Sequence, residues 1–186
     1  MFIQTEQTPN PATLKFIPGK PVLEQGTVDF RSAEEAAGVS PLAERLFGID
    51  NVTGVFFGPD FVSVSKSDQA EWYLLKPAIL GVIMEHFTAG QAVINDGATG
   101  DDGEQTVAEE DQEIVSQIRE LLDTRVRPAV AQDGGDIVFQ GFQRGVVYLH
   151  MRGACSGCPS STATLKMGIE NMLRHYIPEV TEVRAV

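Results

Sequence analysis

Residues 153–159 have the sequence Gly-Ala-Cys-Ser-Gly-Cys-Pro and hold both cysteines of the 186-residue chain, Cys155 and Cys158. Two thiols three positions apart can bind one metal centre, form a small-loop disulfide or exchange electrons as a dithiol. A zinc site or iron–sulfur cluster held by four thiolates cannot be completed by a chain that has two. A metal site here is therefore expected to be shared between two chains or completed by other ligands, and to be exposed.

The cysteines directly precede a predicted helix. Pro159 suits the first helical position, which makes Cys158 the N-cap residue, and apolar residues recur at helical spacing at Leu165, Ile169, Met172, Leu173 and Tyr176. The N-terminus of a helix favours negative charge, so we expect a lowered pKa for both thiols. Gly157 lets the backbone approach a bulky ligand closely. The loop is suited to an anionic, thiolate-rich metal–sulfur cluster.

The second half of the chain follows the order α-β-β-α-β. An apolar stripe at Ile114, Ile118, Leu121 and Leu122 predicts a first helix that ends near Arg127, before Pro128. The run Asp133-Gly134-Gly135-Asp136 predicts a turn, with the two aspartates as turn formers. Strands are expected at 137–139, 146–151 and 180–185, with the cysteine loop and its helix between the last two.

The distribution of charge indicates two domains. Residues 95–113 hold 8 acidic side chains and no basic one, and glycine recurs at every third position from Gly97 to Gly103. Such a stretch cannot bury enough apolar surface to offset the entropy of ordering it. We therefore predict an α+β protein of two small α/β domains, 1–94 and 109–186, joined by a flexible acidic linker at 95–108. In the first domain, 52–57 and 61–65 form a predicted hairpin around Gly58-Pro59-Asp60, and the second arm is expected to be half-buried.

Composition excludes several classes of partner. The formal net charge is -12, which argues against a protein that neutralises nucleic-acid phosphates or adheres to anionic lipid. The apolar runs are too short to span a bilayer. The start of the chain lacks the features of a signal or transit peptide. The expected location is a bacterial-type cytoplasm, although a mature mitochondrial form would have the same features.

Three interpretations of the cysteine pair compete. Buried structural cysteines are disfavoured because glycines, hydroxyls and a helix start surround the pair. A thioredoxin-like dithiol–disulfide oxidoreductase also places such a pair between a strand and a helix, but only 28 residues follow Cys158, too few for the remaining sheet of that fold. The third interpretation is zinc or an iron–sulfur cluster held by two protomers.

A longer comparison favours the cluster. The segment 153–161, with Thr164-Leu165-Lys166-Met167-Gly168-Ile169-Glu170, closely resembles the C-terminal domain of Nfu-type (NifU-like) iron–sulfur cluster carriers. Arg127-Pro128 and Asp133-Gly134-Gly135-Asp136-Ile137 resemble another signature of that domain. The start of the chain, Phe2-Ile3-Gln4-Thr5-Glu6 with Thr8-Pro9-Asn10-Pro11 and Leu14-Lys15-Phe16, resembles the family's N-terminal domain.

The resemblance implies a non-enzymatic carrier or scaffold. Cys155 and Cys158 would bind a [4Fe-4S] cluster shared by a homodimer, which would receive it from upstream assembly machinery and pass it to apo-proteins. The N-terminal domain would recognise those clients. Residues 1–154 contain no cysteine, so the further cysteine-bearing domains of nitrogenase-associated NifU are not expected. Electron transfer and the dithiol oxidoreductase stay as alternatives.

Overall fold

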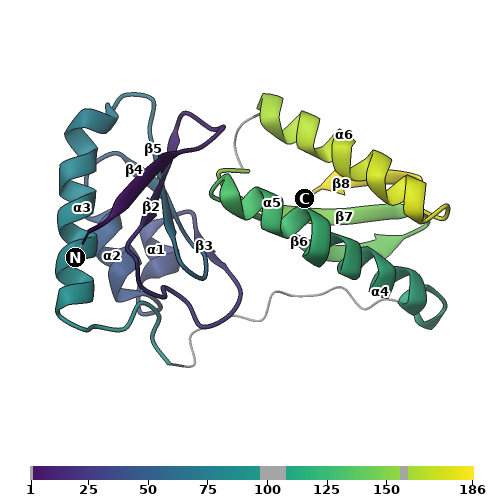
Figure 1. Cartoon of the computed structure of the whole chain (residues 1–186), viewed down its shortest axis with the longest axis horizontal. Coiled ribbons are helices and arrows are strands. Elements are labelled where there is room, and N and C mark those ends of the chain that lie inside the picture. Colours follow the sequence, from purple (N-terminus) through teal and green to yellow (C-terminus); the bar gives the residue numbers. More distant parts are fainter. Residues whose placement is uncertain (1, 97–107, 156–158) are drawn as a thin grey trace. The chain divides into compact units, whose positions relative to one another are not determined.

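The computed structural model describes residues 2–96, 108–155 and 159–186, and for 159–162 it describes the backbone alone. The chain separates into two compact units, Met1–Gly100 and Asp101–Val186, each with its own hydrophobic core (Figure 1). Both units combine helices with a sheet, which confirms the α+β class. Most of the predicted linker lies outside the described residues, so its boundaries stay a prediction.

The first unit is a five-stranded antiparallel sheet covered by helices. The strand order is β1-β2-β5-β4-β3, and the core holds side chains of β2, β4, β5, α2 and α3. The elements are β1 (Gln4–Gln7), β2 (Thr13–Ile17), β3 (Val28–Phe30), α1 (Ala33–Ala36), α2 (Pro41–Phe47), β4 (Val52–Phe57), β5 (Val62–Lys66) and α3 (Trp72–Thr88).

The predicted hairpin is the antiparallel pair β4–β5, which Gly58 closes by donating its N–H to the carbonyl of Phe61 at 3.0 Å. One detail of the prediction is wrong, because β5 is more deeply buried than its alternation of valine and serine suggested. Ser63 is 1% exposed. It pairs with Phe56 on one side and Lys15 on the other, and Lys15 lies over the Phe61 ring. These side chains cover the polar face of the strand.

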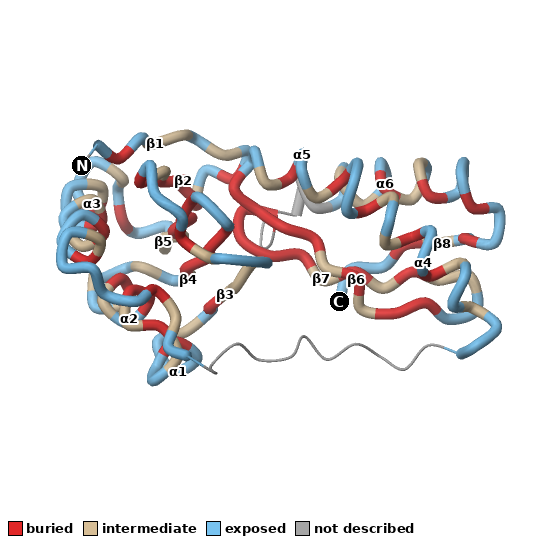
Figure 2. Tube along the Cα trace, turned by 60° about the horizontal axis from the view of Figure 1, so that its bottom comes forward, coloured by how far each residue is buried: buried red, intermediate tan, exposed pale blue. Residues whose placement is uncertain are grey.

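The second unit is a three-stranded sheet with helices on one face. The order β6-β7-β8 joins an antiparallel pair to a parallel one. Ile137, Leu149 and Val183 are fully buried in the core that the strands share with the helices, whereas Val138 and Tyr148, which neighbour them along the strands, are partly exposed. Buried and partly buried positions both occur along β6 and β7 (Figure 2). The elements are η1 (Glu109–Asp111), α4 (Gln112–Leu121), η2 (Leu122–Val126), α5 (Arg127–Gln132), β6 (Gly135–Gln143), β7 (Val146–Gly153), α6 (Pro159–Tyr176) and β8 (Glu182–Ala185).

Two local features set this architecture. Arg144 and Gly145 both have positive φ, 53° and 80°, as a two-residue turn between twisted antiparallel strands requires. Helix α6 then provides the crossover that the parallel pair β7–β8 needs. The cysteine loop lies at the start of this crossover, between β7 and α6.

The first helix of the second unit does not end before Pro128, as predicted, but continues to Gln132 through a π-helical segment. Proline cannot donate an N–H, and its ring collides with the carbonyl four residues back. In η2 the N–H of Arg127 instead reaches Leu122, five residues back. Val126 and Val130 are buried in the core on either side of the proline. Their packing and the wider turn keep the helix continuous, because π-turns accommodate one extra residue.

Candidate functional site

Cys155 lies two residues beyond the end of β7. Gly153 has a positive φ of 62°, which turns the backbone out of the strand. Ala154 then donates its N–H to the carbonyl of Gly134 at 3.2 Å, and Cys155 donates to Arg152 at 3.3 Å. Helix α6 begins at Pro159, as predicted. Cys158, with residues 156 and 157, lies outside the described residues, so the arrangement of the two thiols stays a prediction.

Gly135, the first residue of β6, forms the surface on which the Cys155 side chain lies. A Cβ added at position 135 would be 2.5 Å from Cys155 Sγ and 2.9 Å from both the Cys155 nitrogen and the Arg152 carbonyl oxygen. Any residue other than glycine would therefore displace the thiol or the backbone of its loop. The sequence analysis assigned Gly135 to a turn and missed this contact.

The environment of Cys155 differs from the expected one. Its side chain is buried rather than exposed, with 8% of its surface accessible. Burial, and then the negative charges of Asp133 and Asp136, raise the pKa of the Cys155 thiol to about 12. The prediction of a lowered pKa is wrong for this residue, because desolvation and carboxylates disfavour the thiolate. A thiol with so high a pKa favours the protonated form at neutral pH, so binding of a metal by Cys155 would require loss of that proton.

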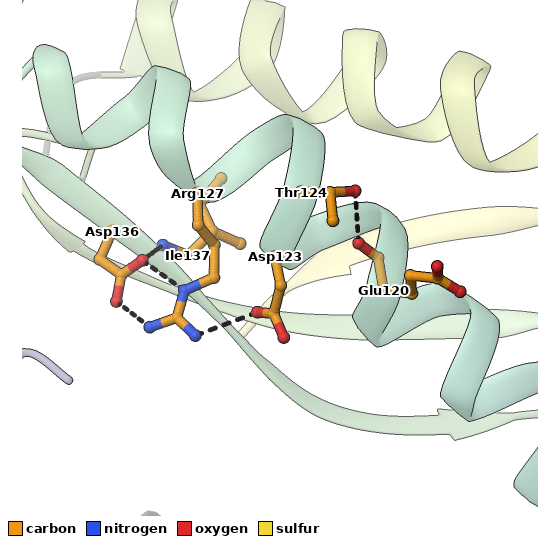
Figure 3. A network of polar contacts seen from close by, with 6 residues as sticks. All are labelled: Glu120, Asp123, Thr124, Arg127, Asp136 and Ile137. Atoms are coloured by element: carbon orange, nitrogen blue, oxygen red, sulfur yellow. Dashed lines mark hydrogen bonds and ion pairs between the residues drawn. The ribbon is translucent and has the colours of Figure 1, made fainter. Parts of the chain in front are cut away.

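Asp136 belongs to a network of charges beside the loop (Figure 3). Its carboxylate is 4% exposed and accepts two hydrogen bonds from Arg127, from Nε to Oδ1 and from Nη2 to Oδ2, both at 2.9 Å. Asp136 Oδ1 also accepts the N–H of Ile137 at 2.8 Å, and Arg127 Nη1 donates to Asp123 at 3.2 Å. The pKa of Arg127 is raised above its ordinary value. The largest cause is its hydrogen bonding to Asp136, and the negative charge of Asp136 adds to the effect.

This network corrects the interpretation of Asp136 as a turn former, because the residue lies in β6 and forms a buried ion pair. Sequence reasoning did not connect Arg127 with Asp136, which are nine positions apart and belong to different elements. The resemblance contained both residues, in its Arg-Pro and Asp-Gly-Gly-Asp segments, but it did not pair them.

Cys155 has no complete set of metal ligands around it in the part of the chain that the structure describes. Among those residues, no group of three or more histidines, cysteines, aspartates and glutamates could hold a metal ion. His150, the histidine nearest to the cysteines in sequence, has its Nδ1 3.0 Å from the carbonyl oxygen of Val186. The candidate ligand among the described residues is the buried thiol of Cys155, and thiols are the donors that iron–sulfur clusters use.

Both halves of the chain match protein families of known type. Residues 3–90 match the family model "Scaffold protein Nfu/NifU N terminal", and residues 118–184 match "NifU-like domain". The chain is 53% identical over 188 residues to the mitochondrial NFU1 iron–sulfur cluster scaffold homolog of Homo sapiens, covering all of this chain and 72% of that protein. The chain belongs to the Nfu/NifU scaffold family.

Other relatives extend beyond the matched region. The chain is 54% identical to the NFU1 iron–sulfur cluster scaffold homolog of Drosophila sechellia and 52% identical to NifU-like protein 4 of Arabidopsis thaliana. It spans 65% of the length of each, with 100% and 98% of this chain covered. A solution structure of a NifU-like protein from Saccharomyces cerevisiae has a TM-score of 0.47 at 25% identity, covering 52% of this chain and 86% of that one.

The comparisons overturn the predicted location. All three relatives, at 52–54% identity, are named mitochondrial, so the expectation of a bacterial-type cytoplasm is wrong. The error arose because composition and cysteine usage are the same for a cytoplasmic protein and for a mature mitochondrial one. Among the described helices, none is long and apolar enough to cross a membrane.

Proposed function

We propose that this protein is a carrier that binds a [4Fe-4S] cluster between two copies of the chain, through Cys155 and Cys158 of each, and transfers it to apo-proteins. The observation that carries the proposal is the supply of thiols. This chain, a member of the Nfu/NifU family, has two cysteines, and both are in one loop. A [4Fe-4S] cluster takes four thiolate ligands. Two copies related by a two-fold axis supply that number.

Transfer from such a site is ligand substitution. Each thiol of the recipient loses a proton and binds an iron, and each departing thiolate of the carrier takes up a proton. No electron is gained or lost, and no bond of the polypeptide changes. A recipient that offers all its ligands from one chain gains the cluster because it need not hold two proteins together. The protein therefore acts without catalysing a reaction.

The predicted N-terminal domain, residues 1–94, which lies within the first unit, is proposed to recognise the recipients. It has a hydrophobic core separate from that of the second unit and matches the N-terminal family model. It contains no cysteine. Comparing the full chain with residues 95–186 alone tests this role: removal of the first unit should slow transfer to a recipient while leaving cluster uptake unchanged.

The test of the main proposal is anaerobic reconstitution with iron and sulfide, followed by metal, sulfide and mass analysis on a sizing column. We expect about four iron and four sulfide per two chains, with dimer formation increasing in parallel with the visible absorption. Cys155→Ser and Cys158→Ser should each remove the colour. A colourless monomer that cycles between dithiol and disulfide would instead establish the oxidoreductase, although a thiol with a pKa of about 12 is a poor attacking group for that chemistry.

A further inference from the structure

Arg127 is linked to Cys155 by a short series of contacts within the second unit. Its Nε and Nη2 each donate to Asp136 at 2.9 Å (Figure 3). Asp136 directly follows Gly135, where an added Cβ would lie 2.5 Å from Cys155 Sγ. A displacement of the start of β6 therefore moves the surface on which the Cys155 side chain lies.

The orientation of Asp136 depends on Arg127. The carboxylate is almost fully buried, and a buried charge requires a partner of opposite sign and hydrogen bonds. Two parallel hydrogen bonds from one planar guanidinium fix the direction of the carboxylate as well as neutralising it. Because Asp136 Oδ1 also accepts the N–H of Ile137, the same contact fixes the backbone of β6. Lysine at position 127 would keep the charge and lose the paired geometry.

The helix around Arg127 is held independently of its side chain. Leu122, Val126 and Val130 are buried in the core of the unit, and the guanidinium projects from this helix toward Asp136 and Asp123 (Figure 3). Loss of the guanidinium should therefore loosen the first residues of β6 while α5 stays in place.

We propose that Arg127 is a positioning residue for Cys155: through Asp136 it fixes the first residues of β6 against the cysteine and thereby prolongs retention of the cluster. The effect on cluster retention rests on the proposed function. The effect of Arg127 on the start of β6 is a property of the protein without a cluster. Mutation of a residue that orients a metal ligand without binding the metal itself typically lowers metal affinity by about 10–100-fold. We expect an acceleration of cluster loss in that range.

The experiment compares Arg127→Lys with Arg125→Lys in the full chain. Arg125 is the matched control because it lies in the same helical run, and its guanidinium is over the Tyr176 ring, 5.2 Å from the centroid. In the protein without cluster, deuterium exchange at the amides of residues 135–139 reports how readily the start of β6 opens. This exchange should rise several-fold in Arg127→Lys, with the rest of the second unit unchanged and Arg125→Lys equal to wild type.

The reconstituted proteins provide a second readout. Arg127→Lys should take up as much iron as wild type but lose its visible absorption to an added chelator about 10–100-fold faster. In Arg127→Ala, added methylguanidinium should slow that loss again by occupying the vacated position beside Asp136. The same compound should have no effect on Arg125→Ala, which separates local rescue from a general effect of the solute.

Two results of the exchange measurement are decisive. Unchanged exchange at 135–139 in Arg127→Lys overturns the proposal, and so does a rise spread evenly over the second unit, which would show a general structural role. If Arg127→Lys does not fold, Asp136→Asn, which keeps an acceptor for the N–H of Ile137, undergoes the same measurements with the same criteria. If wild type takes up no cluster, the proposed function fails, and exchange alone decides whether Arg127 holds the start of β6, against which Cys155 lies, in place.

Discussion

Gly135 and Cys155 are in direct contact across the end of the β6–β7 hairpin, and the contact leaves no room for a side chain at position 135. The three nearest atoms to an added Cβ, the Cys155 sulfur and nitrogen and the Arg152 carbonyl oxygen, would all lie within 2.9 Å of it. Two of them are backbone atoms that cannot rotate away. A glycine that sequence analysis assigns to a turn is therefore part of the wall of the proposed cluster site.

Gly135→Ala is predicted to impair cluster uptake by displacing the Cys155 loop. Forcing one extra methyl group into a packed site costs about 1–3 kcal/mol, and either the thiol or its backbone must move. The measurement is iron content after reconstitution, together with the urea midpoint of the empty protein.

Gly168→Ala is the matched control for that substitution. Gly168 lies in α6, where an added Cβ would meet nothing within 4 Å. Alanine there should stabilise the helix by about 0.8–1 kcal/mol and leave iron content unchanged. Equal iron contents in Gly135→Ala and wild type would contradict the role of Gly135.

Cys155→Ser is predicted to abolish cluster binding while the second unit still folds. The serine hydroxyl would occupy a buried position, and burying a hydroxyl costs about 1–3 kcal/mol in proteins. Cys155 belongs to the hydrophobic core of the second unit, but the other buried side chains of that core are unchanged by the substitution. Far-UV circular dichroism during urea unfolding measures the cost, and iron analysis after reconstitution measures binding. An unfolded Cys155→Ser protein would indicate that the cysteine is structural.

The elements of the second unit were predictable where local sequence determines them. The periodicity of apolar residues predicted α6, and Pro159 predicted its start. The helix across Pro128 was not predictable by the same rules, because the rule that proline ends a helix is local. The burial of Val126 and Val130 on both sides of Pro128 outweighs it through tertiary packing, with a π-turn as the compromise.

The sequence singled out Cys155 and Cys158 as the candidate site, and their role as ligands stays a prediction, whereas the environment of Cys155 was not predictable. The spacing of Cys155 and Cys158 left a metal site, a redox dithiol and structural cysteines open, and the resemblance to the Nfu-type carriers favoured the metal site. The raised pKa of Cys155 results from its burial and from the charges of Asp133 and Asp136, which are distant in sequence, and its side chain packs against Gly135. The ion pair of Arg127 with Asp136 likewise joins a helix to a strand. Such contacts arise only when the elements pack, and no pattern within one element reports them.

The first unit contains a buried histidine whose titration should be measurable. His86, in the last turn of α3, is fully buried, and its Nε2 lies 3.0 Å from the carbonyl oxygen of Ala92. Within the described residues its Nδ1 has no hydrogen-bond partner. Burial, and secondarily the charge of Arg45, lower the pKa of His86 below its ordinary value. The folded unit therefore favours the neutral ring.

We predict that the first unit loses stability as the pH falls below about 6.5, the ordinary pKa of histidine. Above that pH the ring is neutral in both states, and the stability is fully present. Below it the unfolded chain binds a proton that the folded unit resists, so unfolding becomes easier until the folded pKa is passed. Urea midpoints at several pH values, followed by the fluorescence of Trp72, the single tryptophan of the chain, measure this. His86→Gln keeps a donor toward Ala92 and should flatten the dependence; equal slopes in both proteins would assign it to other groups.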